Sequence, residues 1–159
     1  NGTTTLFAAL DVLKGAVIGR CMPRHRHQEF LRFLRMIDKA TPKHMDIHCI
    51  ADNYATHKKQ EVKDWLAKHP RFHLHVIPTS SSWLNLVERW FREITTDRIR
   101  RGVFKSVSDL ERAINDYIEH NNANPRPFVW TKSANDIILK VNRGRAALNM
   151  PPLAPAGSL

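Results

Sequence analysis

The sequence predicts an α/β fold, in which helices pack on a mixed sheet. Short runs of β-branched and apolar residues alternate along the chain with segments whose apolar residues recur at helical spacing, and turn residues separate the two kinds of segment. Hydrophobic residues make up 42% and charged residues 25% of the 159 residues, a balance that is typical of one globular domain and excludes a wholly disordered chain.

Four segments are predicted to be strands. The first two flank the turn signal Lys14-Gly15, and together they predict a hairpin. The third is a short apolar run that ends beside Asp52, and the fourth alternates apolar and polar residues until Pro78 stops it. The strands are expected at residues 3–13, 16–21, 46–51 and 72–77.

Five segments are predicted to be helices. The second carries Val62, Trp65 and Leu66 on one face, which is therefore expected to be buried. Residues 79–82 are Thr and Ser and provide N-cap candidates for the third helix. The helices are expected at residues 27–39, 58–68, 83–98, 108–120 and 132–142.

The predicted domain covers residues 1–143, and the Pro-rich residues 144–159 are expected to form a flexible tail. The chain starts without Met and enters a strand-like run within a few residues. We therefore expect it to be the downstream part of a longer reading frame.

Charge and cysteine usage narrow the class of protein. Lys and Arg total 25 against 15 Asp and Glu, and the net charge of +10 indicates a polyanionic partner such as nucleic acid or an anionic surface. Cys21 and Cys49 form no C-x-x-C pair, so neither a structural zinc site nor a disulfide scaffold is indicated. No apolar run approaches the roughly 18 residues of a membrane span, and we expect a cytoplasmic protein with no membrane partner.

Asp52 is the first candidate for chemistry. It ends an apolar strand, and ligands of open α/β sheets bind outside the carboxyl ends of the strands. The alternative is that Asp52 caps the following turn, an ordinary role for an Asp next to an Asn.

Glu88 is the second candidate, because it lies within the apolar stripe of a predicted helix and is expected to point at the edge of the core. A buried carboxylate is tolerated mainly when it is paired, protonated or bound to a cation. The alternative is a structural ion pair with Arg89 or Arg92. The stripe consists of Leu84, Val87, Phe91 and Ile94.

Asp52 and Glu88 together suggest a site for divalent metal. A carboxylate at a strand end and another on a later helix can converge on one point, and carboxylates that bridge two ions support in-line phosphoryl displacement. Oxygen ligands favour Mg²⁺ or Mn²⁺ over zinc.

Two motifs carry a resemblance to a known family. Asp52-Asn-Tyr-Ala-Thr-His57, followed by Pro78-Thr-Ser-Ser-Ser-Trp-Leu-Asn-Leu-Val-Glu88-Arg-Trp-Phe91, resembles the signature of bacterial insertion-sequence transposases allied to the mariner superfamily. Thirty-five residues separate Asp52 from Glu88, which suits the family's interval between its second and third catalytic carboxylates. Residues 2–10 and 121–130 extend the resemblance to nearly the whole chain.

The resemblance implies an RNase H-like fold with extra C-terminal helices, whose first strand is missing here. It implies metal-dependent cleavage of DNA and transfer of the cut strand, with Asp52 and Glu88 as catalytic metal ligands for Mg²⁺ or Mn²⁺. The family's first catalytic Asp lies upstream of the opening hairpin, and Asp11 fits a hairpin turn better than a metal site. We therefore expect impaired activity, and self-association through residues 3–13, where a missing strand leaves a sheet edge.

Basic residues indicate where DNA binds. A cluster on and after the Glu88 helix suits the DNA backbone, and Lys58 and Trp83 are further candidates for nucleic-acid contact. For any single Arg the alternative is a solvated basic face, and for Trp83 it is a place in the core or at its rim. A second basic group, residues 20–35, surrounds the first helix. The cluster consists of Arg89, Arg92, Arg98, Arg100, Arg101 and Lys105.

The histidines give weaker evidence for a functional site than the carboxylates do. His73 and His75 alternate on one strand face as two metal ligands do, but the sequence indicates no third ligand at zinc-like spacing, so they are interpreted as structural. His57 matches a recurring family position, and helix capping and DNA phosphate contact both remain open for it.

Two other functions compete with the transposase. The chain could be a non-catalytic remnant that binds DNA or self-associates, or an RNase H-type nuclease with the same carboxylates. DNA is the expected partner, and the protein is expected to associate with the nucleoid when it is bound to DNA. A homo-oligomer is also expected.

Overall fold

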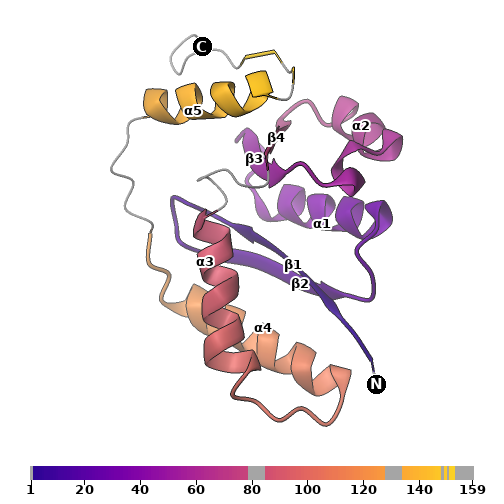
Figure 1. The fold of residues 1–159 in the computed structure, drawn as a ribbon, viewed down its shortest axis with the longest axis vertical. Helices are drawn as coiled ribbons and strands as arrows, with labels where there is room; N and C mark the ends of the chain where they lie inside the picture. The colour runs from indigo at the N-terminus through magenta and orange to yellow at the C-terminus, as the bar shows by residue number, and fades with distance from the viewer. Residues whose placement is uncertain (1, 79–84, 128–133, 148, 150, 153–159) are drawn as a thin grey trace. The chain divides into compact units, whose positions relative to one another are not determined.

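The computed structural model describes residues 2–78, 85–127, 134–147, 149 and 151–152. These residues form two compact units, one made of Asn1–Pro42 with Asn85–Phe128 and the other of Lys43–Leu84 with Val129–Leu159. Figure 1 labels the elements of both units, and each unit is described by itself.

The first unit is built on an antiparallel hairpin of β1 (Thr5–Leu10) and β2 (Val17–Met22). The turn between them needs Gly15, which has a φ of 72° and a Cα that faces the backbone of Arg126 too closely for any side chain. Asp11 Oδ1 accepts hydrogen bonds of 3.1 Å from the backbone N–H groups of Leu13 and Lys14. Asp11 is therefore a turn residue, as the sequence indicates.

Helices cover this hairpin: α1 (His27–Ala40), α3 (Asn85–Ile94) and α4 (Val107–Ala123). In Figure 1, α3 and α4 lie beside the strands, and α3 contacts β1 while α4 contacts β2. Their shared core consists of Val17, Trp90, Ile94, Ile114 and Ile118. A π-helical turn, η2 (Thr95–Ile99), continues α3, and such turns frequently mark functional sites.

The Asn-rich segment at the end of α4 has a structural role. The Asn122 side chain accepts a hydrogen bond from the backbone N–H of Val17 and donates one to the Val17 carbonyl, both at 2.8 Å. Asn121 donates to the Gly15 carbonyl at 3.2 Å. These bonds hold the edge of β2 in the way that a neighbouring strand would.

The second unit is built on two parallel strands, β3 (Ile47–Asp52) and β4 (Phe72–Ile77), in which His48 pairs with His73 and Asp52 with Ile77. The 3₁₀ turn η1 (Ala55–Lys58) and α2 (Gln60–Ala67) connect the strands. The inward face predicted for α2 is confirmed, because Val62 and Trp65 are buried and Leu66 is partly buried. Helix α5 (Ala134–Ala147) packs on β4.

The predicted order of strands and helices is confirmed, and with it the α/β class. The predicted single mixed sheet is corrected: the described strands form two two-stranded sheets, one antiparallel and one parallel. The turn η1 is an addition that the sequence does not predict, and η2 is a π-helical turn at the end of the helix predicted at residues 83–98. Helix α5 continues to Ala147, four residues past the predicted domain boundary at residue 143. The N-cap candidates at residues 79–82 lie outside the described residues, and within the described part no helix is long and apolar enough to cross a membrane.

Candidate metal and nucleic-acid site

Asp52 is the last residue of β3, at the carboxyl end of the parallel pair. Its side chain is 36% exposed, so the carboxylate is held by the strand and still reaches solvent. This is the position at which sheets of this class present ligand-binding groups.

The His57 side chain contacts both the backbone and the carboxylate of Asp52. Its Nδ1 lies 2.8 Å from the Asp52 backbone carbonyl, so the ring donates there, and 3.4 Å from Asp52 Oδ1. The His57 side chain is only 8% exposed, and the Tyr54 ring packs edge-on against it. Burial argues against a DNA phosphate contact for His57. The geometry instead makes it a residue that orients the strand end on which Asp52 lies.

Asn53 directly follows Asp52 in the chain. Its side-chain Oδ1 is buried and has no hydrogen-bond partner among the described residues. The Asp52 carboxylate is a hard oxygen donor, which fits Mg²⁺ or Mn²⁺ better than zinc.

Glu88 lies on α3, and the structure corrects its predicted orientation: Glu88 is exposed. The buried face of α3 is centred on Trp90 and Ile94, which are 4% and 0% exposed, with Phe91 beside them. The predicted stripe omits Trp90, and at about 100° per residue its inclusion turns the centre of the buried face away from Glu88. An exposed carboxylate remains accessible to a metal ion and to DNA.

Arg89, one of the two arginines considered as an alternative ion-pair partner of Glu88, donates from Nε to Glu93 Oε1 at 2.8 Å. All six cluster residues and Lys58 are exposed. Arg98 lies in the π-helical turn, and Arg100 and Arg101 follow it directly. Trp83 lies outside the described residues.

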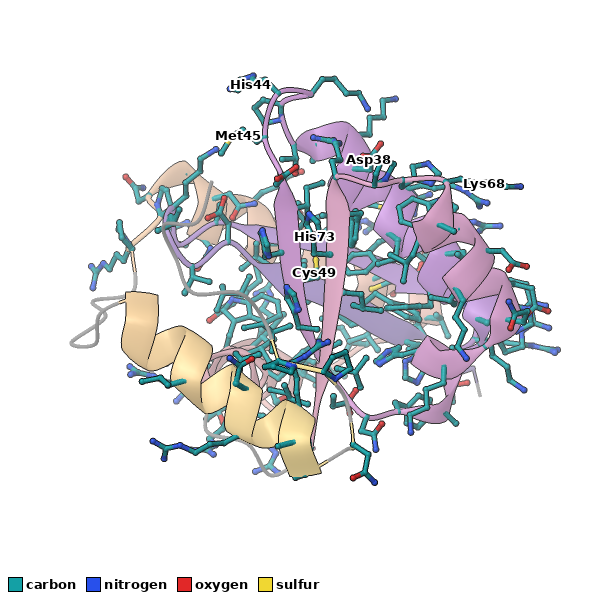
Figure 2. All side chains as sticks on the ribbon, turned by 90° about the horizontal axis from the view of Figure 1, so that it is seen from above. Asp38, His44, Met45, Cys49, Lys68 and His73 are labelled. Carbon is teal, nitrogen blue, oxygen red and sulfur yellow. The ribbon has the colours of Figure 1, made fainter. Side chains whose placement is uncertain are left out.

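Histidines gather at the other end of the β3–β4 pair. His48 and His73 face each other in register with stacked rings 4.6 Å apart, and His48 Nδ1 shares a hydrogen bond of 3.0 Å with His75 Nε2. Asp46, just before β3, lies 3.9 Å from His73 Nε2. Figure 2 labels His73 and Cys49 on this strand pair and His44 and Met45 on the loop that leads into β3. The sequence indicates no third residue to join His73 and His75 of β4, and in the structure His48 of β3 lies next to both of them.

Burial shapes the acid–base chemistry of this strand pair. It lowers the pKa of His75 to about 4, helped by the charges that His48, Arg145 and His73 can carry. Burial also lowers the pKa of His48, and the neighbouring His73 acts in the same direction. The Cys49 thiol has its pKa raised to about 12 by burial, so it stays protonated at neutral pH.

Comparison with known proteins identifies the family. Residues 1–111 match the family described as DDE superfamily endonuclease, and the chain belongs to this family. The 39 kDa protein of insertion element IS630 from Shigella sonnei is 28% identical over 90 residues, which are 57% of this chain and 26% of that protein. The matched stretch thus spans about a quarter of that relative. The predicted assignment to the DDE enzymes is confirmed at the level of the family.

Solved structures confirm the RNase H-like fold class. The catalytic core domain of BIV integrase superposes with a TM-score of 0.58 at 16% identity, covering 90% of both chains. A chain of the simian T-cell lymphotropic virus intasome, solved in complex with the PP2A regulatory subunit B56 gamma, gives 0.59 at 15% identity and covers 100% of this chain and 54% of its own length. Membership of the DDE endonucleases implies dependence on a divalent metal.

Proposed function

We propose that this chain is the core of a transposase that cuts DNA and transfers the cut strand, with Asp52 and Glu88 as its metal ligands. The observation that carries the proposal is the Asp52 carboxylate, which ends the parallel strand β3, reaches solvent and lies beside the buried His57. The family match supplies the class of reaction.

The metal proposed for this site is Mg²⁺ or Mn²⁺. The carboxylates of Asp52 and Glu88 are oxygen donors, which hard cations prefer. Bound divalent ions would activate the attacking oxygen and stabilise the leaving one, so no protein general base is needed. The task of the chain's own residues is to hold the ions and the DNA in line.

A third carboxylate is required by this family's chemistry, and Asp11 is a weak candidate for it, because its side chain is engaged in the hairpin turn. We therefore expect residues 1–159 alone to cleave DNA poorly. The test is a strand-cleavage assay in Mg²⁺ and in Mn²⁺, run beside a version extended upstream in its reading frame. Equal cleavage by the two versions would show that a third ligand lies within residues 1–159, and Asp11→Asn would then be the next variant.

DNA is the proposed substrate and partner, bound through the exposed basic cluster around the π-helical turn. We predict that raising salt from about 50 to 200 mM weakens binding by about 10³-fold or more if six or more phosphates are engaged, with little dependence on DNA sequence. The double variant Arg100→Ala/Arg101→Ala should flatten the slope of log affinity against log salt by about 0.9 for each phosphate that these arginines neutralise.

Arg112→Ala is the matched control for this experiment. Arg112 is an exposed arginine of the same unit, on α4, and it pairs with Asp109 at 3.6 Å. Its removal changes the net charge but should leave the slope unchanged. A flat salt profile for the unaltered chain would contradict the nucleic-acid interface.

A homo-oligomer is also proposed. β1 pairs only with β2 among the described strands, so its other edge offers unpaired backbone groups to a second chain. Light scattering across protein concentration tests this, and a strictly monomeric protein would exclude pairing through β1.

A further inference from the structure

We propose that Asp46, His48 and His73 form a second metal site, for a transition metal of the zinc class rather than for Mg²⁺. One oxygen or nitrogen of each of the three residues lies within 4.8 Å of those of the other two. Two imidazoles and one carboxylate are the donor set of many three-ligand zinc sites. Nitrogen donors also suit Ni²⁺ and Cu²⁺, whereas Mg²⁺ prefers oxygen.

The ligand atoms of the three residues are already close to the separations that a bound zinc ion would require. Ligand atoms about 2.0–2.2 Å from a tetrahedral zinc are about 3.3–3.6 Å from one another. His73 Nε2 and Asp46 Oδ2 are already 3.9 Å apart. Their side chains are 39% and 57% exposed, so small rotations can close the remaining gap without disturbing the core.

The backbone around the site is held in place by secondary structure. His48 and His73 are register partners of two parallel strands, which fixes the separation of their backbones. Arg71 ties both neighbours of Asp46: its guanidinium donates to the Met45 carbonyl at 2.8 Å, and its carbonyl accepts from the Ile47 N–H at 2.8 Å. The three ligands are therefore positioned before any ion binds, which lowers the entropy cost of binding.

His75 is the independent observation that points to a ligand. It is 6% exposed, its Nδ1 has no hydrogen-bond partner among the described residues, and its Nε2 lies 3.0 Å from His48 Nδ1. Because Nδ1 of His48 is engaged with His75, the nitrogen that His48 turns to an ion is Nε2. A ligating histidine ordinarily hydrogen-bonds through its second nitrogen in this way, which fixes the ring and its tautomer.

This site is distinct from the proposed catalytic one. Asp46 and Asp52 are six residues apart along β3, which corresponds to about 20 Å at roughly 3.3 Å per residue. Cys49 is the nearest thiol in the sequence, but alternation along β3 directs it to the opposite face from His48. The inference therefore does not rest on the proposed function.

The test is calorimetric titration of the chain with Zn²⁺ and, separately, with Mg²⁺, supported by the visible absorption of bound Co²⁺. We expect one Zn²⁺ per chain, no Mg²⁺ at this site, and binding at least about 100-fold weaker in His73→Ala. Asp46→Asn preserves shape and should weaken binding about tenfold. His75→Phe keeps the ring buried and removes its hydrogen bond, and should weaken binding by about 10- to 100-fold.

Two control variants test whether Zn²⁺ binds at these three residues and not elsewhere on the protein. His120→Ala removes an exposed histidine of α4, and Asp52→Asn alters the carboxylate of the proposed catalytic site; neither should change Zn²⁺ affinity. Circular dichroism of each metal-free variant shows whether it is folded. Unchanged Zn²⁺ binding in folded His73→Ala and Asp46→Asn, or loss of binding in Asp52→Asn, would overturn the proposal.

Discussion

Asp46 and Asp52 lie at the two ends of one short strand, yet the structure gives them different neighbours. Asp52 lies beside the buried side chain of His57, whose Nδ1 donates to the Asp52 backbone carbonyl, which leaves the Asp52 carboxylate as the oxygen donor at this end. Asp46 lies beside the imidazoles of His48 and His73, which bring nitrogen donors. The same residue type therefore favours a hard cation at one end of β3 and a borderline one at the other, because the neighbours decide the selectivity.

The strongest test of this difference is to replace Asp by Asn at both ends of β3 and to compare the two variants. Asp52→Asn removes a proposed catalytic ligand, and we expect DNA cleavage to fall by about 10³-fold, since a lost metal ligand costs several kcal/mol of transition-state stabilisation. Asp46→Asn should leave cleavage within about twofold. The measurement is single-turnover cleavage in Mg²⁺ by whichever version of the protein, short or extended, is active.

Loss of cleavage in both variants would mean that the two ends act as one site. Glu88→Gln provides the matched carboxylate change on α3 and should resemble Asp52→Asn. If Glu88→Gln cleaves normally while Asp52→Asn does not, Glu88 is excluded as a metal ligand and another acid must take its place.

The two ends also differ in how far the sequence predicts them. Asp52 is predictable, because a strand-end carboxylate and the spacing to Glu88 are both linear features. The histidine site is not, because β3 and β4 pair in parallel: the register that sets His48 opposite His73 joins residues 25 apart and leaves no local pattern. A usable signal is the matching alternation of Asp46 and His48 with His73 and His75 on two predicted neighbouring strands.

The fold shows the same division between local and long-range information. Strand and helix types follow from periodicity, so all nine predicted elements are present. The buried face of α3 does not follow, because an apolar stripe can be drawn with or without Trp90, and only its packing on Ile114 and Ile118 shows that Trp90 belongs to the core. That one residue turns Glu88 from the edge of the core to solvent.

A substitution of His57 tests the proposed metal site at the carboxyl end of β3 and is expected to have a smaller effect. His57→Ala removes the bond to the Asp52 carbonyl, and we expect the apparent Mn²⁺ affinity to fall by about 10- to 100-fold, as for other residues that orient ligands. Cleavage at saturating Mn²⁺ should recover most of its rate, which distinguishes a positioning residue from a merely structural one. The measurement is cleavage rate against Mn²⁺ concentration.

His69→Ala is the matched control for His57→Ala. His69 also binds a backbone carbonyl, that of Trp65 at 2.7 Å, and stacks on the Trp65 ring, so its loss perturbs the packing of the same unit without touching Asp52. An equal shift in Mn²⁺ dependence for both variants would trace the effect to general loosening of the unit.

The smallest expected effect is that of removing one lysine charge near either end of β3 on DNA affinity. Lys58 follows His57 at the Asp52 end, and Lys43 precedes β3 on the Asp46 side; both are exposed. If DNA binds at the carboxyl end, Lys58→Ala should weaken binding a few-fold and reduce the salt slope by about 0.9, the value for a single phosphate. Lys43→Ala removes the same charge and should change neither quantity. Equal effects of the two variants would mean that net charge alone, rather than a defined DNA path past Asp52, governs the affinity.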